Sequence, residues 1–241
     1  MREEKIIIGD GNAYPLNGHL TFPDSPEQKI PAVVLVHGSG PHDMDGTIYQ
    51  NKPFKDIAEA LADHGIAAVR YDKRTYVYGK EMMKAAKNGI PLTVYEETIE
   101  DAVFAAKMLR SDPRIGKVFM LGHSMGGVLA PRIEASGGDF DGLIIAAGTT
   151  RTIREVMFDQ MDEAMMRFKG LLGIIARWQT KRAKSKLLEI DTWTEEELKT
   201  KKFVLGKGIA YHMIEMENHP PGLYTKDMTK SLFVFQGDKD F

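Results

Sequence analysis

Short apolar runs separated by longer amphipathic segments dominate the hydrophobic pattern of this chain. The runs are short enough to be single buried strands, and they cover residues 32–36, 66–69, 118–121, 143–146 and 232–235. Residues 53–64 and 98–109 instead repeat apolar side chains at the three- and four-residue spacing of one helix face. Strands that alternate with helices in units of about 30 residues predict an α/β fold, with a mostly parallel twisted sheet and helices on both of its faces.

A different pattern precedes this alternation and another interrupts it. Residues 5–8 and 18–22 are joined by a turn-rich segment, which predicts an N-terminal β-hairpin. Residues 149–229 show mostly helical periodicity before the last apolar run restores the strand pattern. We therefore expect a core made of residues 1–148 and 230–241, with residues 149–229 inserted into it as a helical lid or cap.

The insertion carries helix signals of its own. Two threonines are each followed three residues later by a glutamate, the capping-box signature of a helix start: Thr152 with Glu155, and Thr194 with Glu197. Three methionines follow the first of these at a spacing of four residues: Met157, Met161 and Met165. This series is expected to pack the lid against the core, and a soft, adaptable wall for an apolar acyl group is the alternative.

Composition excludes several classes of protein. The 241 residues are long enough for one large α/β core, and 32 basic residues nearly balance 34 acidic ones, which argues against a nucleic-acid partner. The chain has no cysteine, so disulfides and thiolate chemistry are excluded. No apolar stretch approaches the length of a membrane span, and the first apolar run is too short for a secretion signal. We expect a cytoplasmic protein with no membrane partner.

The chemistry of the chain centres on the segment Gly122-His-Ser-Met-Gly126, which lies between an apolar strand and a helix-like segment. In this G-x-S-x-G arrangement the serine occupies a sharp, strained turn, so that its hydroxyl stands clear of the sheet. The positions two before and two after Ser124 come close together and must be small, as Gly122 and Gly126 are. The helix that follows directs its free N–H groups toward an oxyanion at this point. This setting favours a serine nucleophile over a plain glycine turn.

Two motifs in this order, Val36-His-Gly-Ser-Gly-Pro41 and then Gly122-His-Ser-Met-Gly126, give the chain a family resemblance. It resembles the α/β-hydrolase superfamily, and within it the bacterial serine carboxylesterases that carry H-G-S-G-P and Y-D-K-R-T segments. The second of these segments is present here as Tyr71-Asp-Lys-Arg-Thr75. The resemblance covers residues 31–148 and 229–241 well, and the insertion only by its position.

The resemblance implies a serine hydrolase that cleaves carboxylic esters through an acyl-enzyme, with Ser124 as nucleophile. In such enzymes one oxyanion donor is the backbone N–H of the residue after the nucleophile, here Met125. The other donor comes from the loop after an earlier strand, and motif position assigns it to the backbone N–H of Ser39. The implied partner is a small-molecule ester, and no metal or cofactor is implied.

The segment Gln236-Gly-Asp-Lys-Asp240 follows the last apolar run and offers two carboxylates for the acid of a catalytic triad. The G-x-x-D spacing of the resembling family picks Asp240, with Asp238 as the second choice. The superfamily order places the catalytic histidine after this acid, yet the sequence ends at Phe241. We therefore expect a truncated chain that lacks the last strand, the histidine loop and the final helix.

This expected truncation has two consequences. It leaves residues 232–235 as an exposed apolar sheet edge, which favours aggregation or a homodimer through that edge. It also keeps a second hypothesis open, a catalytically silent binding protein of the same fold that lacks the base. A lyase or a C–C or other acyl hydrolase on this fold is a further alternative.

The other polar residues near the motifs are interpreted as structural. His37 and His123 lie beside the two glycine turns, and each is expected to be packed and hydrogen-bonded rather than to act as a base. Four charged residues follow the strand at 66–69: Arg70, Asp72, Lys73 and Arg74. They are expected to pair with Asp43 or Asp45 and to brace the oxyanion loop, and contact with an anionic substrate is the alternative.

Overall fold

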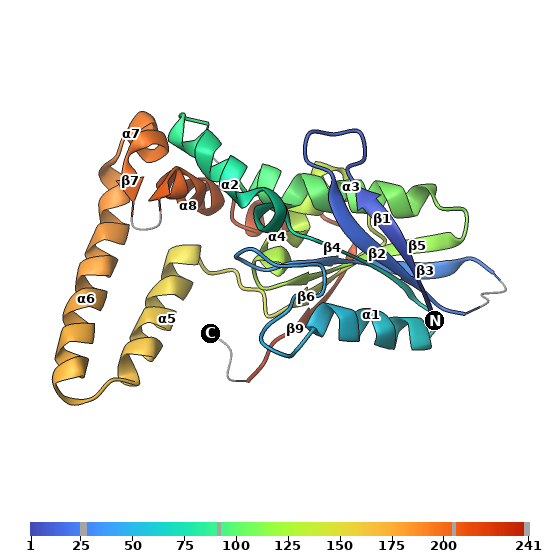
Figure 1. Cartoon of the computed structure of the whole chain (residues 1–241), viewed down its shortest axis with the longest axis horizontal. Coiled ribbons are helices and arrows are strands. Elements are labelled where there is room, and N and C mark those ends of the chain that lie inside the picture. Colours follow the sequence, from blue (N-terminus) through green and yellow to red (C-terminus); the bar gives the residue numbers. More distant parts are fainter. Residues whose placement is uncertain (25–27, 91–92, 204–205, 239–241) are drawn as a thin grey trace. The chain divides into compact units, whose positions relative to one another are not determined.

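The computed structural model describes residues 1–24, 28–90, 93–203 and 206–238. The chain divides into two compact units (Figure 1). Unit 1 contains residues 1–79, 94–150 and 221–238, and unit 2 is built mainly from residues 80–93 and 151–220.

Unit 1 is organised around a seven-stranded sheet. Its strands are β1 (Arg2–Ile8), β2 (Leu16–Phe22), β3 (Ile30–Val36), β4 (Ala67–Tyr71), β5 (Ile115–His123), β6 (Gly142–Ala146) and β9 (Ser231–Phe235). The spatial order is β1-β2-β4-β3-β5-β6-β9, with β1 and β2 antiparallel and every pair from β4 to β9 parallel. The predicted mostly parallel sheet and the N-terminal hairpin are therefore confirmed.

Helices cover the sheet of unit 1, and Figure 1 shows α1 (Pro53–Asp63) and α3 (Glu100–Ser111) on opposite faces. The remaining helical elements of this unit's chain segments are η1 (Tyr95–Ile99), α4 (Met125–Ile133), η2 (Glu134–Gly138) and α9 (Gly222–Thr225). A further helix, α2 (Arg74–Lys87), was not predicted, and η1 and η2 are single π-helical turns. The α/β fold class is confirmed.

Central strands of this sheet are buried on both faces, which explains their uninterrupted apolar runs. Every residue from Ala32 to Val36 in β3 is buried, and all five are aliphatic. The carboxyl ends of β3, β4 and β5 lie side by side because these strands are parallel neighbours. Loops that follow these strands are consequently gathered at one edge of the sheet.

Unit 2 is mostly helical. Its helices are α5 (Ile153–Met166), α6 (Gly170–Glu189), η3 (Ile190–Thr192), α7 (Glu195–Thr200) and α8 (Ile209–Asn218), and a short hairpin joins β7 (Lys202–Phe203) to β8 (Gly206–Lys207). Thr152 and Thr194 cap α5 and α7 as predicted, each in a complete capping box. The hairpin was not predicted.

The apolar core of unit 2 explains part of the methionine series. Met157 and Met161 pack against a buried cluster that includes Leu187 and Ile190. Arg154 adds a polar clamp, since it pairs with Glu217 and with Asp191. Among the described residues, no helix is long and apolar enough to cross a membrane.

Candidate active site

Ser124 occupies the strained turn that its motif requires. It lies between β5 and α4 with φ 52° and ψ −118°, a backbone conformation that non-glycine residues rarely adopt. Its N–H donates to the carbonyl of Ala146 at 2.8 Å, and its own carbonyl accepts from Gly127 at 2.9 Å and Val128 at 3.0 Å. The surrounding backbone thus holds the strained residue from both sides.

The two glycines that flank Ser124 are required sterically. A Cβ atom at Gly122 would lie 2.3 Å from the carbonyl oxygen of Gly126, which no real contact allows. A Cβ atom at Gly126 would lie 2.5 Å from the carbonyl oxygen of Val36 and 2.6 Å from that of His37. The turn therefore packs directly against the end of β3, in agreement with the predicted need for small residues.

The segment that follows β3 lies against Ser124. A Cβ atom at Gly38 would be 3.1 Å from the Cβ of Ser124 and 3.3 Å from the carbonyl oxygen of His123. Ser39 follows directly and is exposed, whereas Met125 is buried at the start of α4. Because the first N–H groups of a helix lack partners within the helix, the amide of Met125 begins such an end. Both predicted oxyanion donors therefore belong to segments that adjoin Ser124.

Two histidines hold the loop after β3. His37 is buried, stacks on Phe54 with ring centroids 4.5 Å apart, and donates from Nε2 to the carbonyl of Tyr71 at 2.8 Å. Burial lowers the pKa of His37 to about 3, so the ring is neutral at neutral pH. His42 donates from Nε2 to the carbonyl of Ser39 at 2.8 Å. The structural interpretation of His37 is confirmed.

The charged segment after β4 braces the same loop, though not in every predicted pair. Arg70 donates from Nε to Asp45 at 2.9 Å, and Asp72 accepts the backbone N–H of Met44 at 2.8 Å. The expected bracing is therefore confirmed at these two positions. The expected pairing with Asp43 or Asp45 is wrong for the other two cations: Lys73 pairs with Glu97, and Arg74 pairs with the acidic residues Glu100 and Asp101 of α3.

Lys73 is as deeply buried as Arg70. Its side chain is 2% exposed, and its Nζ lies 2.8 Å from the carbonyl oxygen of Gly38 and 2.7 Å from Glu97 Oε1. Its backbone N–H donates to the carbonyl of His42 at 2.9 Å. Burial lowers the pKa of the Lys73 ammonium, and the Glu97 carboxylate opposes that shift.

The predicted acid falls at the margin of the described structure. Asp240 lies outside the described residues, and Asp238 is exposed in the turn after β9. The end of β9 is held beside β6, because the carbonyl of Phe235 accepts the N–H of Ala147 at 2.9 Å. His123, at the end of β5, is exposed.

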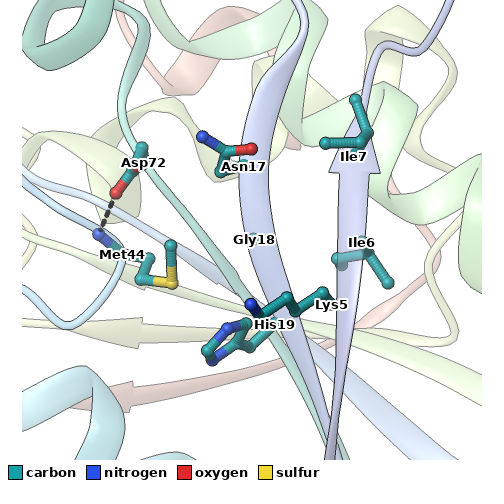
Figure 2. Close-up of a pocket in the computed structure, with 8 residues that line it drawn as sticks. All are labelled: Lys5, Ile6, Ile7, Asn17, Gly18, His19, Met44 and Asp72. Atoms are coloured by element: carbon teal, nitrogen blue, oxygen red, sulfur yellow. Dashed lines mark hydrogen bonds between the residues drawn. The ribbon is translucent and has the colours of Figure 1, made fainter.

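A hollow of about 470 Å³ opens beside the N-terminal hairpin, and its lining does not include Ser39, Ser124 or Met125 (Figure 2). It is lined by Lys5, Ile6, Ile7, Asn17, Gly18, His19, Met44 and Asp72. Burial raises the pKa of Asp72, whose carboxylate points to the Met44 amide in Figure 2. Sequence reasoning missed this hollow, since its walls come from four separate segments and no local motif marks them.

A sequence model of the family described as "Serine aminopeptidase, S33" matches residues 27–240. The chain is also 36% identical over 239 residues to Esterase EstD of Thermotoga maritima. That match covers 99% of this chain and 52% of EstD, so the chain spans about half the length of this relative.

Solved structures share the fold at lower identity. Est1E from Butyrivibrio proteoclasticus matches with a TM-score of 0.57 at 17% identity, over 97% of this chain and 77% of that one. The acylaminoacyl peptidase of Pyrococcus horikoshii matches with a TM-score of 0.52 at 16% identity, over 97% of this chain and 31% of that one. The S33 family match and this shared fold agree with the elbow and sheet described above: the chain belongs to the serine aminopeptidase S33 family of α/β hydrolases.

Proposed function

We propose that this chain carries the nucleophile and oxyanion hole of a serine carboxylesterase. The hydroxyl of Ser124 attacks the carbonyl carbon of an ester, the alcohol leaves with a proton, and an acyl-serine forms. Water then cleaves the acyl-serine, which releases the acid and restores the hydroxyl. The observation that carries this proposal is the strained backbone of Ser124, packed against the Gly38 loop.

The oxyanion of this reaction is assigned to two backbone donors, the N–H groups of Ser39 and Met125. Both belong to segments that adjoin Ser124, one in the loop after β3 and one at the first turn of α4. Donors aimed at the developing charge before it forms need no reorganisation, and each is typically worth about 10²–10³ in rate. Asp240 is proposed to orient the histidine that accepts the proton of the serine hydroxyl.

The substrate is proposed to be a small-molecule carboxylic ester. The word esterase in the name of the T. maritima relative supports ester over peptide cleavage, although the family description names an aminopeptidase. Residues 149–229 are proposed to act as a lid, and the protein is proposed to work in the cytoplasm. A homodimer through the β9 edge is proposed as well, because every residue of β9 is exposed.

Labelling with a fluorophosphonate tests the nucleophile directly. The protein at its natural length is expected to gain one probe, and Ser124→Ala is expected to abolish labelling measured by intact mass. Ser111→Ala is the matched control, because that hydroxyl donates to the carbonyl of Lys107 within α3. Labelling that survives Ser124→Ala would refute the assignment, and a wild type that takes no probe and turns over no ester would support the silent binding protein.

A further inference from the structure

Lys73 places a positive charge directly behind the loop that adjoins Ser124. Its side chain is 2% exposed, and the ammonium donates to the carbonyl of Gly38 at 2.8 Å. A buried ammonium is costly unless it is paired, and here Glu97 supplies the counter-charge at 2.7 Å. One of the few charges buried in this unit therefore contacts a backbone carbonyl of the candidate oxyanion loop.

That carbonyl and the proposed oxyanion donor belong to the same peptide unit. The oxygen of Gly38 and the N–H of Ser39 lie on opposite edges of one planar trans peptide bond. A contact that holds the oxygen consequently fixes the direction of the N–H. The next peptide is held as well, because His42 donates to the carbonyl of Ser39 at 2.8 Å.

Lys73 makes two hydrogen bonds to this loop. Besides the side-chain bond to Gly38, its backbone N–H donates to the carbonyl of His42 at 2.9 Å. The segment between these two carbonyls contains Ser39. Side chain and backbone of one residue thus bracket the donor that the ester reaction would use.

Glu97 owes its position to an unusual backbone feature. It lies in the π-helical turn η1, which precedes α3, and its side chain is 7% exposed. Single π-turns of this kind occur frequently at functional sites. The buried carboxylate lies 2.7 Å from the Lys73 ammonium and so pairs with it while the ammonium contacts the loop carbonyl.

We propose that Lys73, held by Glu97, is the positioning residue of the oxyanion hole: it orients and polarises the Gly38–Ser39 peptide. A charge-assisted hydrogen bond to the carbonyl draws electron density away from the nitrogen and strengthens the N–H as a donor. This inference rests on the proposed esterase function, because ester cleavage produces the oxyanion that the N–H of Ser39 would stabilise. A preorganised donor acts mainly on the transition state, so its loss lowers kcat more than it changes KM.

The neighbouring pair of Arg74 and Asp101 provides a matched control. Both side chains are as buried as those of Lys73 and Glu97, at 3% and 2% exposure. The Arg74 side chain donates to Glu100 and Asp101 of α3, and within the described part of the chain it makes no hydrogen bond to the loop after β3. Breaking this pair disturbs a buried ion pair of the same unit without touching the Gly38 carbonyl.

The experiment compares Lys73→Met with Arg74→Met in the protein at its natural length. Measurements are kcat and KM for p-nitrophenyl butyrate, the inhibition constant of an alkyl boronic acid that becomes tetrahedral on the serine, and the melting temperature. For Lys73→Met we expect kcat to fall about 10- to 100-fold, KM to change less than about 3-fold, and boronic acid binding to weaken in step with kcat. Arg74→Met is expected to lower the melting temperature comparably, with kcat within about 3-fold of wild type.

Two results would overturn the inference. One is a folded Lys73→Met enzyme with kcat and boronic acid affinity close to wild type. The other is an equal loss of kcat in both variants, which would reduce Lys73 to general support of the fold. Inactivity of Ser124→Ala keeps the esterase proposal intact in either case, whereas activity that survives Ser124→Ala would refute that proposal itself.

Conservative variants keep the test decisive if Lys73→Met does not fold. Lys73→Arg retains a charged donor and is expected to keep more of kcat than Glu97→Gln, which leaves the ammonium without its counter-charge. Both are expected to keep KM near the wild-type value. If instead both variants alter KM and leave kcat unchanged, the contact governs substrate binding and the inference is wrong.

Discussion

The strands β3 and β9 both precede residues of the proposed site, yet the structure holds these two strands very differently. The end of β3 is buried, and its loop is tied to the neighbouring β4 segment through Tyr71, Arg70 and Lys73. The strand β9 pairs with β6 on one side, and all five of its residues are exposed. One part of the proposed site thus follows a strand at the sheet centre, and the strand that precedes the proposed acid lies at the sheet edge.

This difference indicates how each region will respond to change. Around Ser124 the backbone is over-determined, since carbonyl oxygens of neighbouring segments leave no room for a Cβ at Gly122 or Gly126. β9 is held by the ladder to β6, by the bond between Ala147 and Phe235, and by the contact of the Phe233 and Phe235 rings. Substitutions in the first region should disturb geometry, and substitutions in the second should disturb chemistry or association.

The largest effect is expected at the acid that follows β9. In the protein at its natural length, Asp240→Asn should lower kcat by about 10⁴-fold, because the histidine loses the partner that fixes its tautomer. Asp238→Asn is the matched control in the same turn and should be mild, since Asp238 is exposed. Steady-state kinetics on the two variants decide the register of the turn, and a reversed ranking would move the acid to Asp238.

Local patterns predicted most of the fold. The strands, the helix at residues 53–64 and the two capping boxes depend on the residue's own spacing or on neighbours a few positions away. The elbow was predictable for the same reason, because strand, glycines and helix are contiguous. Helix α2 was missed, since Tyr78 interrupts its helical backbone and its charged residues obscure an amphipathic pattern.

Contacts between distant segments could not be predicted in detail. Bracing of the loop after β3 was expected, but the bond from Lys73 to Gly38 joins residues 35 positions apart in the sequence. The predicted partner of Arg74 was wrong. Asp101 lies 27 positions away in the sequence, and only the packing of α3 brings it to Arg74. Such pairs depend on the tertiary arrangement, which the charges alone leave undetermined.

A medium effect is expected from acid, through the buried ring of His37. Folding lowers the pKa of His37 from 6.5 to about 3, so below pH 6.5 the unfolded chain binds a proton that the folded chain refuses. Stability from this group is therefore complete above pH 6.5 and falls as the pH drops toward 3, by about 1.4 kcal/mol per pH unit. At pH 5 the loss should reach about 2 kcal/mol.

Urea unfolding at pH 7 and pH 5 measures this loss. His37→Gln keeps an N–H donor for the carbonyl of Tyr71 but cannot titrate, so its stability deficit relative to wild type should shrink by about 2 kcal/mol at pH 5. Asp101 acts in the opposite direction, since burial raises its pKa to about 6, but both proteins carry it and its effect cancels. His64→Gln is the control, because His64 is exposed. A stability deficit of His37→Gln that does not change with pH would contradict the prediction.

The smallest effect on stability is expected at the β9 edge, where the consequence is association instead. Phe233 and Val234 are 57% and 53% exposed, whereas the opposite edge strand β1 carries the charged run Arg2-Glu-Glu-Lys5. An apolar edge with free backbone groups is a template for pairing with a second copy, and charged side chains prevent such pairing.

The 241-residue chain is therefore expected to associate as its concentration rises. Val234→Lys should abolish this association and change the unfolding free energy by less than about 1 kcal/mol, because Val234 is already half exposed. Ile7→Lys on β1, 44% exposed, is the matched control and should leave association unchanged. Size-exclusion chromatography with light scattering over a range of concentrations separates these outcomes. A wild-type chain that stays monomeric at high concentration would show that the β9 edge does not recruit a second copy.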